Sequence, residues 1–258
     1  MQHSFAGSVL KNLLLTISYD GKCFHGWQIQ QNALTVQEIF QNALSKIIGD
    51  DFDIKGCSRT DSGVHANMYC ISLKTHHPIE PARLKAALNR WLPKSVAVLD
   101  CISVAGDFHA RYSCVSKEYI YKIWNSEVRN PFLDGYALHY RYKIDEIMLN
   151  AAAQAYVGKH DFTSFCTLDN REKGDMTRNV KAFSVTRDGD MITMKVEADG
   201  FLYNMVRIMV GTLLKIQQGK LSVESIPEII EKKNRKYAGP TAQACGLYLN
   251  RVNYNIPV

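Results

Sequence analysis

This 258-residue sequence contains two stretches in which helix-type and strand-type patterns of apolar residues follow one another in the same order. In the first stretch, apolar residues recur at helical spacing over residues 36–48 and 81–91, and short apolar runs lie around them. Those runs, read as strands, are residues 13–19, 53–57, 69–73 and 96–104. The resulting order, βαββαβ, is that of a ferredoxin-like unit built on a split βαβ motif.

Specific residues mark the ends of these predicted helices. Thr35, followed three positions later by Glu38, forms a capping-box pattern that starts the first helix, and Gly49 ends it. Pro81 suits the first turn of the second helix, and Pro93 cannot continue it. The helix assignments therefore rest on end signals as well as on periodicity.

The second stretch repeats the order. Its predicted strands are residues 117–124, 180–187, 191–198 and 246–252, and its predicted helices are 144–157, 204–217 and the shorter 223–232. Asp188-Gly189-Asp190 joins two of the strands and is typical of a hairpin turn.

We therefore expect an α+β fold made of two ferredoxin-like halves, residues 1–107 and 108–258. No Pro-rich or low-complexity linker separates the halves. Two antiparallel sheets that form a shared cleft, with helices packed on the outer face, are the expected architecture.

Charge and targeting signals narrow the class of protein. The net charge of +6 suits a polyanionic partner, but it falls short of a strongly basic nucleic-acid domain. The segment Met1–Ser8 has no apolar run of signal-peptide length, and no stretch has the length of a membrane span, so the cytoplasm is the expected compartment. The seven cysteines lack C-x-x-C spacing, which favours reduced, mostly buried thiols and no metal site.

The loop that joins the second and third predicted strands carries the candidate chemistry. Arg59 and Asp61 lie two positions apart, so a guanidinium can favour the ionised carboxylate, which is able to act as a nucleophile. Gly63 permits a backbone conformation that other residues avoid. On residue types alone, an ordinary turn with a surface ion pair and a satisfied His65 is the favoured interpretation of this loop.

The loop Ser58-Arg59-Thr60-Asp61-Ser62-Gly63-Val64-His65 resembles the catalytic motif of TruA-type tRNA pseudouridine synthases, written G-R-T-D-x-G-V-H. The resemblance covers almost the whole chain. Further matching segments, in order, are Tyr19-Asp20-Gly21, Phe24-His25-Gly26-Trp27-Gln28, Thr35-Val36-Gln37, Phe108-His109-Ala110-Arg111, Tyr119-Ile120-Tyr121, His160-Asp161-Phe162, Phe201-Leu202-Tyr203-Asn204-Met205-Val206-Arg207, Gly239-Pro240-Thr241-Ala242 and Gly246-Leu247.

This resemblance implies an isomerase that converts uridine to pseudouridine in tRNA, without metal or cofactor. It implies that Asp61 is the nucleophile toward a flipped uridine, on the ring or on the sugar. It also implies that Arg59 fills the gap left by the flipped base, and that His65 belongs to the same substrate-binding loop.

Three substrate-binding roles in the second half follow from the same resemblance. Tyr119 would pack on the uracil, Arg207 would place a positive charge near the catalytic carboxylate, and Leu247 would form an apolar wall. Without the resemblance, an ordinary strand aromatic, a solvent-facing arginine and a core leucine are the simpler interpretations. Similarly, Trp27 is expected either to border the RNA cleft or to pack in the core.

By resemblance, the partner is tRNA, bound at its anticodon stem-loop across a homodimer. Ser58, Asn204 and Glu118 depart from the family pattern, where Gly, His and a basic residue are usual, and they leave the target uridines open. The alternatives are an RNA-binding or RNA-folding module without catalysis, and a metal-dependent hydrolase, for which the sequence groups no ligands.

Overall fold

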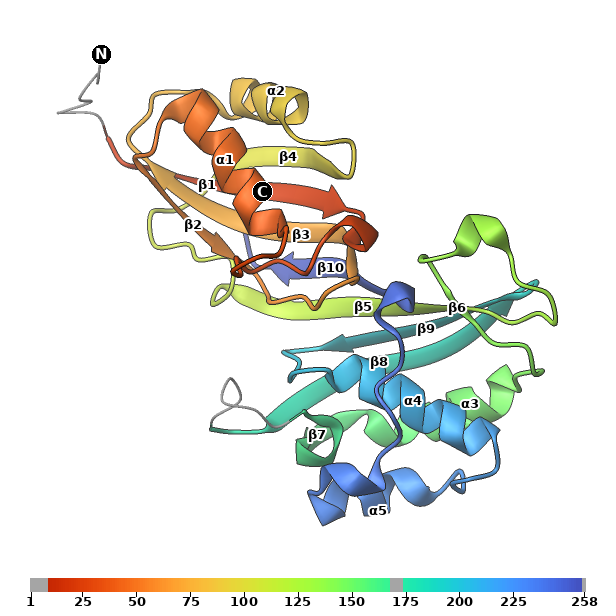
Figure 1. Ribbon diagram of the computed structural model, residues 1–258. Helices are drawn as coiled ribbons and strands as arrows, with labels where there is room; N and C mark the ends of the chain where they lie inside the picture. The colour runs from red at the N-terminus through yellow and green to blue at the C-terminus, as the bar shows by residue number, and fades with distance from the viewer. Residues whose placement is uncertain (1–8, 168–173, 257–258) are drawn as a thin grey trace. The chain divides into compact units, whose positions relative to one another are not determined.

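The computed structural model describes residues 9–167 and 174–256 (Figure 1). The expectation placed on Met1–Ser8 therefore lies outside the described residues. The chain forms two compact units: unit 1 comprises Met1–Val115 and Leu249–Val258, and unit 2 comprises Ser116–Tyr248. The chain thus leaves unit 1 after Val115 and returns to it at Leu249.

Unit 1 has the predicted order of elements. Its strands are β1 (Lys11–Tyr19), β2 (Phe52–Gly56), β3 (His65–Thr75) and β4 (Val96–Ser103). They are ordered β4-β1-β3-β2 and every neighbouring pair is antiparallel. The third strand thus lies between the first two, which is the split βαβ arrangement.

Helices α1 (Val36–Ile48) and α2 (Pro81–Trp91) lie on one face of the unit 1 sheet (Figure 1). The predicted cap is present, since the Thr35 hydroxyl accepts a hydrogen bond from the Glu38 amide at 3.4 Å. Gly49 ends α1 with a φ of 75°, a value that favours glycine. Both helices therefore begin and end where the sequence predicted.

The strands of unit 2 are mainly antiparallel. Its strands are β5 (Cys114–Trp124, whose first two residues belong to unit 1), β6 (Leu138–His139), β7 (Gly158–Asp161), β8 (Thr177–Asp188) and β9 (Met191–Ala198). The order is β5-β9-β8-β7, and β6 pairs in parallel with β5. The strand β10 (Leu247–Tyr254) begins in unit 2 and lies beside β3 in unit 1. The predicted α+β class is confirmed.

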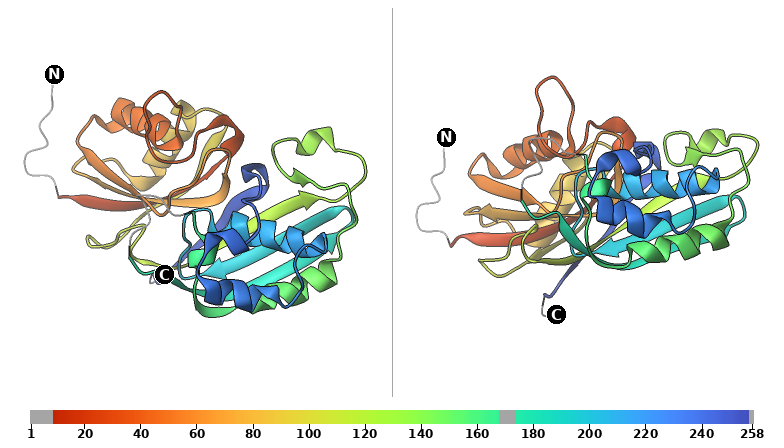
Figure 2. Two further views of the ribbon diagram at one scale, coloured as in Figure 1. Left: turned by 60° about the horizontal axis from the view of Figure 1, so that its bottom comes forward. Right: turned by 90° about the horizontal axis from the view of Figure 1, so that it is seen from below.

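The helices of unit 2 are α3 (Glu146–Ala153), α4 (Met205–Gln217) and α5 (Ser225–Lys232), and they lie on one face of its sheet (Figure 2). The predicted helix over 144–157 is shorter in the structure. It starts after the Asp145 cap and tightens to a 3-10 turn at Gln154–Tyr156, and Gly158, with a φ of 117°, opens β7. The other 3-10 turns are Gly21–Cys23, Pro131–Leu133, Thr163–Phe165, Arg235–Tyr237 and Ala244–Gly246.

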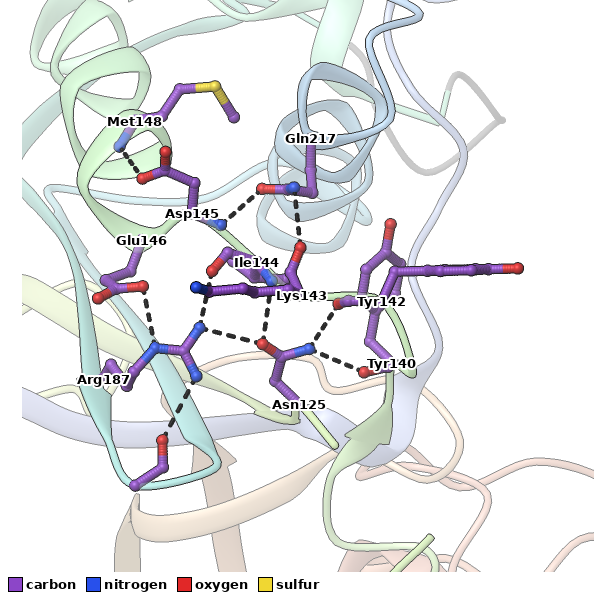
Figure 3. A network of polar contacts seen from close by, with 11 residues as sticks. Asn125, Tyr140, Tyr142, Lys143, Ile144, Asp145, Glu146, Met148, Arg187 and Gln217 are labelled. Atoms are coloured by element: carbon purple, nitrogen blue, oxygen red, sulfur yellow. Dashed lines mark hydrogen bonds and ion pairs between the residues drawn. The ribbon is translucent and has the colours of Figure 1, made fainter. Parts of the chain in front are cut away.

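A polar network at the end of β5 fixes a long excursion of the chain, residues 126–143 (Figure 3). Asn125 is 7% exposed. Its amide nitrogen donates to the carbonyl oxygens of Tyr140 and Tyr142, at 2.9 and 2.7 Å. Its oxygen accepts from the Ile144 amide and from the Arg187 guanidinium, both at 3.0 Å. One side chain therefore ties both ends of the excursion together.

Arg187 extends this network to α3 (Figure 3). Its Nε lies 2.9 Å from the Glu146 carboxylate, and its Nη2 donates to the Ile144 carbonyl at 2.7 Å. The hydrogen bond from Arg187 lowers the pKa of Glu146, so the ion pair persists to a more acidic pH than an ordinary glutamate allows. Gln217, at the end of α4, donates to the Lys143 carbonyl at 3.0 Å. The base of the excursion is thus bonded to two helices and a hairpin.

Replacing Asn125 with alanine removes a buried donor and acceptor and leaves main-chain groups of the excursion without their partner. We expect the free energy of unfolding to fall by about 2–3 kcal/mol, measured by urea unfolding with circular dichroism. Asn42→Ala, at an exposed position of α1, is the matched control and should change that value by less than about 0.7 kcal/mol. Equal effects of the two substitutions would contradict a structural role for Asn125.

Candidate functional site

The loop that carries Asp61 connects β2 to β3 in unit 1, and hydrogen bonds hold it on both sides. The Tyr19 hydroxyl lies 2.8 Å from the Thr60 hydroxyl, and the Trp27 amide donates to the Thr60 carbonyl at 3.3 Å. Further along, the Val64 amide donates to the Asp61 carbonyl at 3.2 Å and closes a turn. The residues on both sides of Asp61 are therefore fixed.

Two glycines let the segment after β1 pack directly against this loop. A Cβ atom at Gly21 would lie 2.1 Å from the Val64 carbonyl oxygen, and one at Gly26 would lie 2.2 Å from that of Thr60. Gly26 also has a φ of 88°, which favours glycine. The segment after β1 and the Asp61 loop, which resemble one family through separate motifs, thus pack directly against each other.

Trp27 and Tyr69 support the same loop from the core. Trp27 is 4% exposed and stacks on Tyr69 with ring centroids 4.3 Å apart. The Tyr69 hydroxyl donates to the Ser58 carbonyl. Of the two interpretations that the sequence left open for Trp27, core packing is the correct one. Ser58, which departs from the family pattern, is held through its main chain.

His65 is buried at the start of β3, with 2% of its side chain exposed. Its Nδ1 accepts a hydrogen bond from the Gly21 amide at 3.0 Å and lies 3.3 Å from the Asp20 carboxylate. These contacts hold the Gly21 segment in place.

Asp61 and Arg59 differ in exposure within this fixed loop. Asp61 is partly buried, whereas Arg59 is exposed. The hydrogen bonds of the loop backbone hold this partly shielded carboxylate in a defined position.

In unit 2, Tyr119 and Tyr121 lie on the same face of β5, as their alternate positions require. Tyr119 is 6% exposed, and its ring meets Phe201 edge to face at 5.0 Å. The Tyr121 hydroxyl donates to the Gln243 carbonyl at 2.8 Å. Burial raises the pKa of Tyr121, so this hydroxyl stays protonated and acts as a donor.

Arg207, in the first turn of α4, is held in place on two sides. Its Nε donates to the Ala242 carbonyl at 2.7 Å, and the Ala242 amide donates to the Arg207 carbonyl at 3.0 Å. Its Nη1 donates to the Asn204 side-chain oxygen at 3.0 Å, and Asn204 in turn donates to Thr167. The simpler interpretation of Arg207 as a solvent-facing helix residue is therefore wrong.

Close backbone packing brings Ala242 to Arg207. A Cβ atom at Gly211 of α4 would lie 1.8 Å from the Pro240 carbonyl oxygen, and the Gly239 amide donates to the Thr212 hydroxyl at 2.8 Å. Leu247 follows at the start of β10 and is 6% exposed, as in a core leucine.

Sequence reasoning missed three residues that position the candidate side chains of unit 2: Phe201, Asn204 and Gly211. Asn204 was noted only as a departure from the family pattern, although its φ of 63° and its amide position the arginine. In the sequence, the signal for Gly211 is its place inside an apolar helical pattern. A glycine that a helix tolerates at such a position indicates close packing.

Among the described residues, no group of three or more His, Cys, Asp or Glu side chains is arranged to hold a metal ion. In the same ranges, no helix has the length and apolar character needed to cross a membrane.

Comparison with known proteins identifies the class. The family described as tRNA pseudouridine synthase matches residues 15–113 and 152–255. A protein called tRNA pseudouridine synthase A 2 from Bacillus cereus is 38% identical over 95% of this chain and 100% of its own length. Proteins called tRNA pseudouridine synthase A from Thermoanaerobacter sp. and Acetivibrio thermocellus are 39% and 40% identical, with the same coverage of each chain.

The chain belongs to the tRNA pseudouridine synthase family. The enzyme class is therefore that of an isomerase acting on uridine in tRNA.

Adding one methyl group at Gly21 tests the packing beneath the Asp61 loop. Gly21→Ala would push the Val64 carbonyl aside and lower the free energy of unfolding by about 1–3 kcal/mol. Gly106→Ala is the matched control in unit 1, since nothing lies within 4 Å of its Cβ position. Thermal unfolding of both variants measures the difference, and an unchanged melting temperature in Gly21→Ala would contradict the tight packing.

Proposed function

We propose that this chain converts uridine to pseudouridine in tRNA with the Asp61 carboxylate as nucleophile. The observation that carries the proposal is the loop of unit 1, in which the backbone around a partly buried aspartate is bonded on both sides. A loop built only as a surface turn does not require two glycines packed beneath it. The sequence of this loop matches the catalytic motif of the family, and that match supports the assignment.

The reaction balances without an external group. The bond between the sugar C1′ and uracil N1 breaks, the uracil turns, and a bond from C1′ to C5 forms. C5 loses a proton, N1 gains one, and no electrons are exchanged. Asp61 can attack either the ring or the sugar, and both routes use the same ionised carboxylate.

The uridine must leave the base stack to reach this carboxylate. Flipping a base costs a few kcal/mol, and least where the base is loosely stacked. In our proposal the exposed Arg59 occupies the vacated space in the stack, and Tyr119 packs on the uracil. Arg207 supplies a fixed positive charge.

Leu247 and His65 have supporting roles in the proposal. Leu247 forms an apolar wall of the uracil site, and its burial is compatible with that role. His65 acts through the Asp20–Gly21 segment that it binds, so it is a positioning residue of the substrate-binding loop. The substrate, by the same resemblance, is the anticodon stem-loop of tRNA, bound by a homodimer in the cytoplasm.

Incubation with unmodified tRNA transcripts, followed by chemical mapping of pseudouridine, tests the reaction. Asp61→Asn should lower the rate by about a thousandfold or more, since it removes the nucleophile but keeps the shape of the side chain. Affinity for tRNA should stay within about tenfold, because contacts with phosphates dominate binding.

Asp107→Asn, at an exposed position of unit 1, is the matched control and should keep full activity. Folded wild-type protein that modifies no transcript would point instead to an RNA-binding module. A large loss of affinity in Asp61→Asn would show that Asp61 is structural.

A further inference from the structure

Unit 2 carries a hollow of about 350 Å³ between the 126–143 excursion and the chain before β10. This volume falls in the range of small-ligand sites. Its lining includes Trp124, Arg129, Asp134, His139, Gln243 and Cys245. The hollow does not contain Tyr119 or Arg207, so it is distinct from the proposed uracil site.

One segment, residues 242–245, borders both the hollow and Arg207. The Ala242 carbonyl accepts from Arg207 at 2.7 Å, and the Gln243 carbonyl accepts from Tyr121 at 2.8 Å. The next lining residue, Cys245, has its pKa raised mainly by burial, and the charges of Asp134 and Arg207 act on it in opposite directions. Cys245 therefore lines the hollow three positions after Ala242, whose carbonyl accepts from Arg207.

The hollow is fixed before any ligand binds. Asn125 and Arg187 tie the ends of the excursion, as Figure 3 shows. The middle of the excursion is bonded to β10, since the Tyr248 hydroxyl donates to the Tyr136 carbonyl at 2.7 Å. A preformed site loses less entropy when it binds a flexible ligand.

The chemistry of the lining suits an unstacked nucleotide. Arg129 is exposed and can bind a phosphate, while the partly exposed Trp124 indole offers a flat surface for a base. Asp134 and Gln243 provide oxygen and amide groups that can bond to a base edge.

We propose that this hollow binds a nucleotide of the tRNA that neighbours the target uridine. The inference rests on the proposed function, because it places the target uridine near Tyr119 and Arg207. A flipped uridine leaves its neighbours partly unstacked, so an adjacent receptor for one of them offsets part of the cost of flipping. The identity of that neighbour then contributes to which uridines are modified.

Equilibrium binding to tRNA transcripts tests this inference without requiring turnover. Abasic nucleotides are placed singly at the two positions on each side of the modified uridine. One of these replacements should weaken binding of the wild-type protein by about tenfold, the loss typical of one stacked base. In Arg129→Ala and Asp134→Asn, the same replacement should weaken binding by less than about threefold, because the receptor is already impaired.

Arg141→Ala is the matched control. Arg141 is exposed in the same excursion, does not line the hollow, and lies over the Tyr142 ring at 5.2 Å. It should retain the full tenfold abasic penalty. Thermal unfolding of all three variants should match the wild type, because each replaced side chain is exposed.

The inference would be overturned if no abasic position had a binding penalty that is smaller in Arg129→Ala or Asp134→Asn than in the wild type. It would also be overturned if Arg141→Ala reduced that penalty in the same way. Failure of the proposed function is distinguishable, since the wild-type protein would then form no pseudouridine on any transcript. An active enzyme without this coupling would overturn the inference about the hollow alone.

Discussion

In each unit, the candidate functional side chains depend on close approach of one backbone to another where no Cβ atom fits. In unit 1 this contact joins Gly21 and Gly26 to the loop of Asp61, and in unit 2 it joins Gly211 to Pro240. Hydrogen bonds alone would leave such loops able to shift, because exposed main-chain groups also bond to water. Steric contact between main chains does not permit that shift, so the functional side chains start from fixed positions.

Side chains that bond to main-chain atoms provide the second level of order. Arg207 and Asn125 both bind carbonyl groups of segments that lack regular secondary structure. An arginine or asparagine can do this because it presents several donors in a fixed plane. The cost is that each such residue cannot be exchanged for an isosteric apolar one without leaving buried polar groups unsatisfied.

The sequence predicted the elements of unit 1 well because their signals are local. Thr35, Gly49 and Pro81 act within a few residues of themselves, and the structure places the helix ends at them. The return of the chain to unit 1 at Leu249 has no local signal, since a closing strand looks the same wherever it pairs. The shortened α3 and the extra strand β7 depend on Gly158, whose left-handed φ the pattern of apolar residues does not reveal.

The candidate residues show the same division between local and long-range information. The loop motif identifies Asp61 without any structure, but neither the glycines beneath it nor Asn204 beside Arg207 can be assigned from spacing. Arg207 connects these two kinds of information, because it belongs to a recognisable motif and also bonds to Ala242, 35 positions later. The segment that it holds continues into the lining of the hollow. One main-chain segment therefore borders both the hollow and the Arg207 guanidinium.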